Sequence, residues 1–410
     1  MSGPVTAGTL RSLAATVYIP SAVFGIGQGA GAPVVALIAR DLGASVGTAG
    51  AIVALVGLGA VVGDLPAGRV VARFGERRAI IVGSSIGAVG VLMCLAAPNP
   101  VVLAIGVALT GLASAVWGLA RQSYLAEVVP LPMRARAMAM FALTWRLGYF
   151  VGPFLGAVVI LAAGTRGGFA VQFVGIVLAG YLMARMDDPP RPPDAEPGGV
   201  PLRQILRRHR VLLATLGTGA LLMGAARASR DAVLPLWADH LGLHAATASL
   251  VFGIGALADL LCSYPAGQIM DRYGRRLVAV PSLVVITVSF VALPFTTTVV
   301  GMTAIAVLMG VGNGLGNGVI MTLGADAAPP ATRAEFLAAW RLMHDSGMFL
   351  GPLAVGAVAA AAPLGCAAAT LGAVSGLGAA VMHRFIPRYS PPRARGARAE
   401  TDENAAQKGL

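Results

Sequence analysis

The segment GQIMDRYGRR (Gly267 to Arg276) lies between two long apolar stretches, and a segment of the same design, GRVVARFGERR (Gly68 to Arg78), begins 199 residues earlier. In both segments, an arginine lies five residues after the first glycine, and a second glycine lies seven residues after the first glycine. Glycine permits a tight turn and a close approach of neighbouring helices. A basic turn that recurs between apolar stretches predicts a duplicated chain that crosses a membrane.

Composition supports this prediction. The 410 residues are 57% hydrophobic and 12% charged, whereas soluble domains are roughly half apolar and about a quarter charged. A membrane-spanning helix needs about 20 apolar residues. We predict an all-α membrane protein of twelve transmembrane helices, in the apolar stretches 12–39, 49–67, 79–97, 101–125, 137–162, 168–185, 210–238, 248–267, 277–295, 299–323, 335–361 and 366–386.

The two halves of the chain align at one constant shift of 199 residues. Pro66-Ala67-Gly68 falls on Pro265-Ala266-Gly267, and Gly152-Pro153 falls on Gly351-Pro352. Because six helices is an even number, the copies are parallel repeats about an axis along the membrane normal. The expected units are a six-helix bundle over 1–185, a cytoplasmic linker over 186–209, a second bundle over 210–386 and a disordered tail over 387–410.

The net charge of +12 is spread over short gaps between apolar stretches, which disfavours a nucleic-acid partner. With the N-terminus inside, 23 basic residues lie on the cytoplasmic side and only Arg40 and Arg166 lie outside. The positive-inside rule therefore predicts a multi-pass protein of the plasma (inner) membrane with both termini cytoplasmic. The three cysteines have no metal-site or disulfide spacing, so no metal and no cofactor are predicted.

The two basic turns resemble the loop signature of the major facilitator superfamily. The second copy is complete, with Gly267, Asp271, Arg272, Gly274, Arg275 and Arg276. The first keeps Gly68, Arg73 and Gly75 but has Ala72 and Glu76 where the family has Asp and Arg. The resemblance implies two bundles that rock about a central site, with these loops as a cytoplasmic gate.

A second motif lies in the fifth apolar stretch. Gly148, Gly152, Pro153 and Gly156 are similar to a superfamily element associated with exporters, and Gly347, Gly351 and Pro352 repeat it in the eleventh stretch. Small residues four apart let helix backbones meet. The motif therefore indicates export, or else packing alone.

Ionisable side chains inside the bilayer are costly and tend to have a role or a partner. Asp64, Asp231, Asp259 and Asp345 qualify. The packing implied by the family suggests that Arg146 pairs with Asp259, and Arg341 with Asp64, as ion pairs between the halves. Asp345 is then left without an arginine, so Asp345, with Asp259 as the alternative, is the predicted proton-coupling residue.

In the superfamily, helices 1, 4, 7 and 10 line the central cavity. The resemblance therefore gives the substrate-contact candidates Gln28, Trp117, Arg121, Arg227, Asn313 and Asn317. Arg227 and Asp231 are one helical turn apart, a spacing that allows them to neutralise each other.

The predicted function is proton-coupled efflux of a small molecule by a monomeric antiporter in the lipid bilayer. The alternatives are uptake or facilitated exchange of a polar metabolite, and a receptor or scaffold that keeps the carrier fold without transport. An enzyme is disfavoured because no catalytic cluster is present, and the absence of a GxxxxGK[ST] segment argues against ATP as the driver.

Overall fold

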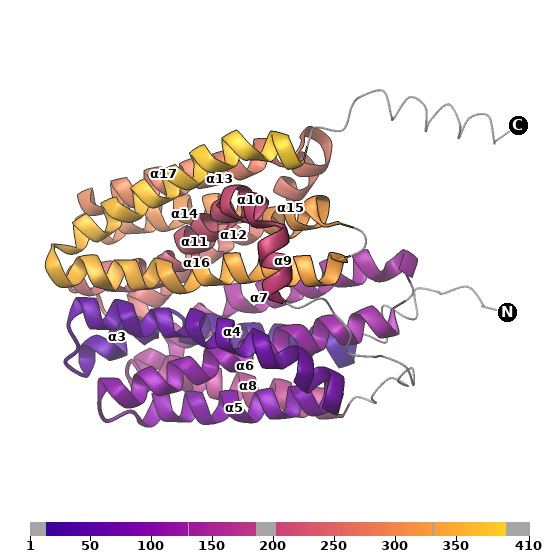
Figure 1. Cartoon of the computed structure of the whole chain (residues 1–410). Coiled ribbons are helices and arrows are strands. Elements are labelled where there is room, and N and C mark those ends of the chain that lie inside the picture. Colours follow the sequence, from indigo (N-terminus) through magenta and orange to yellow (C-terminus); the bar gives the residue numbers. More distant parts are fainter. Residues whose placement is uncertain (1–13, 130, 186–201, 330–331, 391–410) are drawn as a thin grey trace, which may run out of the picture.

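The computed structural model describes residues 14–129, 131–185, 202–329 and 332–390, and within these ranges every regular element is a helix (Figure 1). The first half contains a π-helical turn at Ala14–Tyr18 followed by α2 (Ile19–Gly31), α3 (Val34–Asp41), α4 (Val46–Phe74), α5 (Glu76–Ala96), α6 (Pro100–Val128), α7 (Leu131–Ala163) and α8 (Gly167–Ala184). The second half contains α9 (Leu202–Arg208), α10 (Arg210–Leu212), α11 (Thr218–His240), α12 (Ala245–Tyr273), α13 (Arg276–Ala292), α14 (Val299–Leu315), α15 (Val319–Ala327), α16 (Arg333–Ala361) and α17 (Leu364–Tyr389), with short π and 3₁₀ turns at Leu213–Gly217 and Leu293–Phe295.

Among the described residues, eleven helical spans are long and apolar enough to cross a membrane. Helix α16 is not one of them, although its 29 residues match the length of its neighbours. Arg341, His344 and Asp345 lie near its middle and lower its hydropathy. Its length and its packing among the apolar helices make it the twelfth span.

The helices pack as two bundles with matching contacts. In the first, α2 packs on α7, α4 on α6 and α5 on α8; in the second, α11 packs on α16, α12 on α14 and α13 on α17. Each of these pairs has its counterpart at the repeat shift read from the sequence. The bundles meet where α4 contacts α16 and where α7 contacts α12, the two contacts that the family resemblance implies.

Two of the predicted helices are broken. The stretch 12–39 divides into α2 and α3 at Ala32 and Pro33, because proline cannot continue the hydrogen-bond ladder of the preceding turn. The stretch 299–323 divides into α14 and α15 at Gly316 to Gly318, where Gly318 has a φ of 80°, which only glycine adopts readily. The expectation of one continuous helix in each stretch is therefore wrong.

The glycine motif joins helices within each bundle. A methyl group at Gly148 of α7 would overlap the carbonyl oxygen of Ala22 on α2, and one at Gly347 of α16 would overlap that of Leu221 on α11. Gly152 and Gly351 are equally tight, whereas Gly156 is looser, with 3.3 Å from such a methyl to the Ala30 Cβ atom. Pro153 and Pro352 lie inside helices that continue past them.

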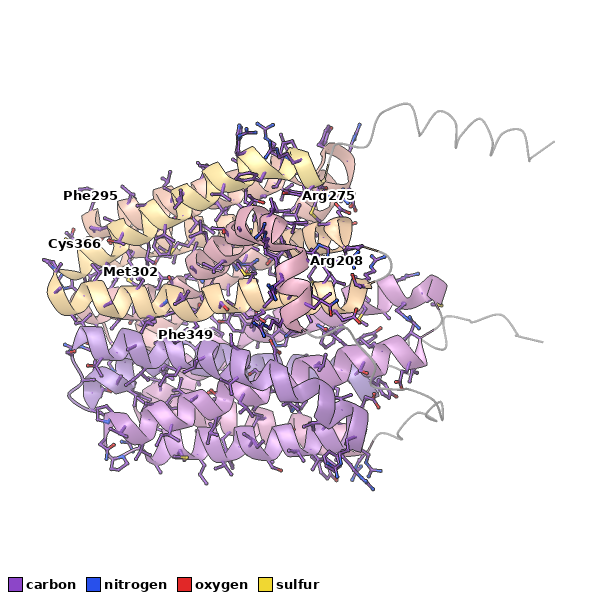
Figure 2. The ribbon with its side chains drawn as sticks, viewed as in Figure 1. Arg208, Arg275, Phe295, Met302, Phe349 and Cys366 are labelled. Carbon is purple, nitrogen blue, oxygen red and sulfur yellow. The ribbon has the colours of Figure 1, made fainter. Side chains whose placement is uncertain are left out.

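The two ends of the bundle differ in charge. Figure 2 shows Arg208 and Arg275 at one end, called here the linker end, and Phe295 and Cys366 at the opposite or far end. At the linker end, Gly75 and Gly274 turn the chain with φ values of 89° and 95°.

The loop motif at the linker end is fastened through Arg275, whose guanidinium lies 2.8 Å from the carboxylate of Asp326 on α15. Arg276 contacts His383, while Asp271 is exposed. Arg73 and Arg272 each lie over the ring of the residue that follows. The side-chain surroundings of Gly68 lie outside the described residues, as do positions 186–201 of the predicted linker and 391–410 of the predicted tail.

Candidate functional site

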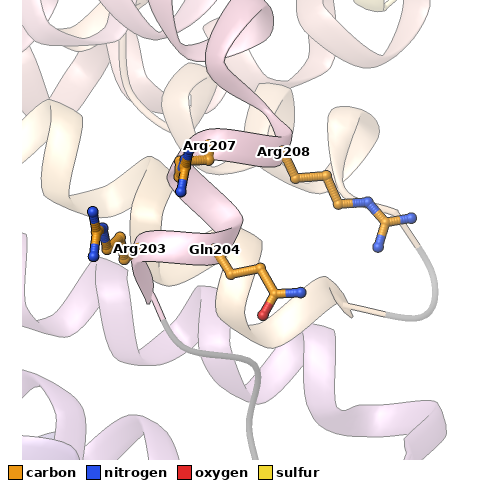
Figure 3. Close-up of a pocket in the computed structure, with 4 residues that line it drawn as sticks. All are labelled: Arg203, Gln204, Arg207 and Arg208. Atoms are coloured by element: carbon orange, nitrogen blue, oxygen red, sulfur yellow. The ribbon is translucent and has the colours of Figure 1, made fainter.

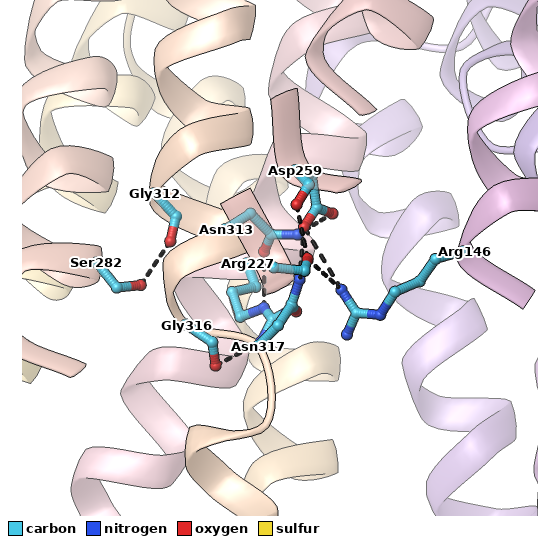
Figure 4. Close-up of polar contacts among 9 residues, drawn as sticks. Arg146, Arg227, Asp259, Ser282, Gly312, Asn313, Gly316 and Asn317 are labelled. Atoms are coloured by element: carbon cyan, nitrogen blue, oxygen red, sulfur yellow. Dashed lines mark hydrogen bonds and ion pairs between the residues drawn. The ribbon is translucent and has the colours of Figure 1, made fainter. Parts of the chain in front are cut away.

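Asp259 of α12 is the centre of a polar network inside the second bundle (Figure 4). The Asn313 amide donates to its Oδ2 atom at 2.7 Å, and the Asn317 amide donates to its Oδ1 atom at 2.6 Å. Ser263, one turn further along α12, donates to the Asp259 carbonyl oxygen and accepts from Asn317. The carboxylate is thus held by two amides of the broken tenth span, Asn313 in α14 and Asn317 at the break between α14 and α15.

Arg227 of α11 completes this network. Its Nε atom donates to the Asn313 amide oxygen at 2.7 Å, its Nη2 atom donates to Asn317, and its Nη1 atom donates to the Gly316 carbonyl oxygen at 3.3 Å. At the break between α14 and α15, this carbonyl accepts both from Arg227 and from the Val319 backbone N–H. Each nitrogen of the Arg227 guanidinium thus has an acceptor in that span, and its predicted pairing with Asp231 is wrong; Asp231 lies 3.5 Å from Arg230 instead.

The first bundle reaches the same network through Arg146 of α7. Its Nη1 atom donates to the Ser263 hydroxyl at 3.2 Å and lies 3.5 Å from the Asp259 Oδ1 atom. The predicted Arg146–Asp259 pair is thus present in the structure. One arginine from each half thus belongs to the network, Arg146 beside the Asp259 carboxylate and Arg227 through the Asn313 and Asn317 amides.

A second polar cluster lies at the other contact between the bundles. Arg341 of α16 donates from Nε to Asp345 at 3.2 Å, and its Nη2 atom lies 3.5 Å from Asp64 on α4. His344 Nδ1 lies 3.0 Å from the other oxygen of Asp345. The Arg341–Asp64 pair is present as predicted, but the expectation that Asp345 lacks an arginine is wrong.

Arg121 occupies a separate, buried site in the first bundle. Its guanidinium donates to Ser21 at 2.7 Å and lies 5.4, 4.6 and 4.5 Å from the ring centres of Phe24, Trp117 and Phe141. Trp117 stacks on Phe24, and its indole donates to Ser84.

Gln28 donates to Ser114 at 2.9 Å, also within the first bundle. The six predicted substrate contacts thus divide into two sets. The structure joins Arg227, Asn313 and Asn317 around Asp259, and leaves Gln28, Trp117 and Arg121 with partners of their own bundle.

One pair that the sequence analysis missed lies at the far end. Arg40 of α3 donates from Nε to Asp239 of α11 at 2.9 Å, and from Nη1 to the Ala44 carbonyl oxygen at 2.7 Å. Arg40 and Asp239 are 199 residues apart, so they are the same position of the two repeats. Opposite charges at one repeat position were a signal available in the sequence.

A groove on the surface of α9 is lined by Arg203, Gln204, Arg207 and Arg208 (Figure 3). All four belong to one seven-residue helix at the linker end. This groove shares no residue with either polar cluster and adds to the basic character of that end.

Known proteins share both the sequence pattern and the fold. The family model of the Major Facilitator Superfamily matches residues 17–352 and 216–408. The chain belongs to the major facilitator superfamily. It is accordingly a multi-pass membrane transporter rather than an enzyme.

Individual relatives are distant. An uncharacterised MFS-type transporter of Methanocaldococcus jannaschii is 22% identical over 86% of this chain and 92% of its own length. A chloramphenicol resistance protein of Streptomyces lividans is 30% identical over 59% of this chain and 62% of its own length.

Among solved structures, a POT family transporter in complex with a thioalcohol-conjugated peptide has a TM-score of 0.77 at 14% identity, covering 93% of this chain and 97% of its own. The nucleoside transporter NupG has a TM-score of 0.70 at 15% identity, covering 91% and 98%. At such identities the likeness extends to the fold only.

Proposed function

We propose that this transporter is a proton-coupled exporter of a small molecule in the plasma membrane, with the linker end and both termini in the cytoplasm. The basic residues at the linker end support this orientation through the positive-inside rule. Cysteine labelling tests it: Thr165 would react from outside, and Gln204 of α9 only from inside.

Proton coupling is carried by the Asp64–Arg341–Asp345 cluster. Two carboxyl groups share one guanidinium, and Asp345 has His344 as a second neighbour. Two carboxylates with one arginine in a region of low dielectric favour the uptake of a proton. Both Asp259 side-chain oxygens, by contrast, already accept from the Asn313 and Asn317 amides, and one of them lies 3.5 Å from Arg146. The cluster is therefore the better proton site of the two candidates.

The position of the cluster links the proton to the transport cycle. Asp64 belongs to the first bundle and Asp345 to the second, and the α4–α16 contact must loosen when the bundles rock. Protonation of one carboxyl changes the attraction of both to Arg341. A proton can thus bias the equilibrium between closed and open arrangements of this contact, as alternating access requires.

The two bundles are in close contact at the far end. A methyl group at Gly47 of α4 would lie 2.8 Å from the Gly356 carbonyl oxygen of α16, and Arg40 bridges to Asp239. These contacts support closure of the side that the proposed orientation places outside.

Export is favoured over uptake by two observations. The α7 motif is similar to the exporter-associated element, and one relative is named a chloramphenicol resistance protein. Chloramphenicol is therefore an uncharged first probe, and benzoate serves beside it as an anionic one.

The test uses purified protein in liposomes with an imposed pH gradient. The wild type should accumulate the transported probe in proportion to the gradient, and Asp345→Asn and Asp64→Asn should each lose gradient-driven accumulation while keeping exchange at zero gradient. Asp41→Asn, the same change at an exposed residue of the far end, is the matched control. Full gradient-driven accumulation by both cluster variants would contradict proton coupling at this site, and accumulation in the direction of uptake would contradict export.

A further inference from the structure

Arg230 of α11 is a buried cation with incomplete bonding. Its side chain is 8% exposed, and its Nε and Nη1 atoms have no hydrogen-bond partner in the described part of the chain. The Asp231 Oδ1 atom lies 3.5 Å from Nε and likewise has no hydrogen bond there. The Nε atom faces Asp231 as an ion pair, and the Tyr149 hydroxyl is a further neighbour of Arg230, so Nη1 is the donor that lacks an acceptor. A buried donor without an acceptor costs free energy, and an additional acceptor at Nη1 would remove that cost.

The surroundings of Arg230 form a site with a polar and an apolar side. One face of the guanidinium lies 5.0 Å from the ring centre of Phe252. Arg230 also lines a small cavity together with Arg227 and Asn313, and the remaining lining is apolar: Ala226, Ile286, Phe290 and Met309. The cavity is about 10 Å³ in this conformation, which is room for about one water molecule.

Arg227 and Arg230 have different roles in this site. Every nitrogen of the Arg227 guanidinium already donates to Asn313, Asn317 or Gly316. Each Arg227 nitrogen is therefore held by α14 or by the break that follows it, whereas the Arg230 Nη1 atom has no acceptor in the described part of the chain.

The net charge around the cavity is positive. Among the described residues, the three arginines Arg146, Arg227 and Arg230 lie near two acids, Asp231 and Asp259. The α4–α16 cluster has the opposite excess, with two carboxyl groups on one arginine. In a region of low dielectric, an unbalanced guanidinium attracts an anion strongly.

We infer that the molecule exported under the proposed function is an organic anion, whose carboxylate binds the Nη1 atom of Arg230 while its apolar part packs against Ile286, Phe290 and Met309. The small cavity represents the closed form of this site. The ligand enters when α11 and α14 separate beside the break at Gly316 to Gly318.

Binding of simple probes to the purified full-length protein tests the inference without transport. The probes are benzoate and hexanoate, their neutral amides benzamide and hexanamide, and chloride, each measured by isothermal titration calorimetry at pH 7. At least one carboxylate should bind at least tenfold more tightly than its amide, and Arg230→Gln should weaken that binding at least tenfold. Arg185→Gln, which removes an exposed arginine of the first bundle, should leave it unchanged.

Arg230→Lys keeps the charge and serves if Arg230→Gln does not fold; it should bind with intermediate affinity, because an ammonium lacks the planar donor set. Equal binding of acid and amide, binding unaffected by both Arg230 variants, no carboxylate binding, or binding of chloride alone would each overturn the inference. Failure of proton coupling with intact Arg230-dependent carboxylate binding would instead refute the proposed function and leave the anion site standing.

Discussion

The Arg40–Asp239 pair gives the sharpest prediction, because the repeat places both residues in the same local structure. In the first copy the turn after α3 has hydrogen bonds from Leu42 to Ile38, from Gly43 to Arg40 and from Ala44 to Ala39; the second copy has them from Leu241 to Trp237, from Gly242 to Asp239 and from Leu243 to Ala238. An arginine at position 239 would therefore find the Leu243 carbonyl where Arg40 now finds that of Ala44. The swapped pair R40D/D239R should form the same bridge.

The size of the expected change in the open population follows from the exposure of the Arg40 and Asp239 side chains. The two side chains are 33% and 34% exposed, and pairs of this kind contribute about 0.2–1 kcal/mol. Since 1.4 kcal/mol is about a tenfold change in an equilibrium constant, loss of the pair in Arg40→Asp or Asp239→Arg should raise the population open at the far end by up to about fivefold. Repulsion between the two like charges adds to this increase. The swap should return it to within about twofold of wild type.

The assay is the distance between spin labels at Asp41 and His240, two exposed residues at equivalent repeat positions, in a background without Cys94, Cys262 and Cys366. Each single reversal should enlarge the fraction of molecules in which the two labels are far apart. The swap should return this fraction to near its wild-type value. A swap that opens the far end as much as the two single changes combined would refute the reasoning, because it would show that the pair does not fasten the two bundles.

Two further predictions concern packing and charge between helices. Removing either Arg146 or Asp259 should lower transport, and R146Q/D259N should recover part of the loss with a coupling energy of about 0.5–3 kcal/mol in a double-mutant cycle; additive losses would contradict the pairing. Gly347→Ala should destabilise the purified protein by about 1–3 kcal/mol because its methyl overlaps the Leu221 backbone, whereas Gly267→Ala, which meets nothing within 4 Å, should keep the wild-type melting temperature.

The sequence was a good guide to the bundle because its signals are strong and repeated. The length of the apolar stretches identified the spans, and the constant shift aligned the two halves. The α4–α16 and α7–α12 contacts were predicted from the family resemblance. The broken spans were harder to predict. Glycines are common in membrane helices. The sequence alone therefore could not separate Gly316 to Gly318, where the chain turns and Arg227 bonds to a carbonyl, from glycines that serve helix packing.

Pairing of charges inside the bundle could be read only in part. Arg341–Asp345 and Arg227–Asp231 have the same four-residue spacing, yet the first pair bonds and the second does not. The difference comes from another helix: α14 places the Asn313 amide beside Arg227, whereas α4 places a second carboxylate, that of Asp64, beside Arg341. Local spacing permits a pair, and the neighbouring helix determines whether it forms.

The Arg230 cavity has an excess of positive charge, and the Asp64–Arg341–Asp345 cluster has an excess of negative charge. If the first binds an anion and the second a proton, the exchange of the two moves charge across the membrane. A proton entering and a monovalent anion leaving both carry positive charge inward, so one exchange moves two charges across the membrane. Each charge is worth about 2.3 kcal/mol per 100 mV, so an inside-negative potential of that size supplies about 4.6 kcal/mol before any pH gradient is counted. The membrane potential alone would then sustain an anion gradient of more than about a thousandfold, and export would continue where the pH difference across the membrane is small.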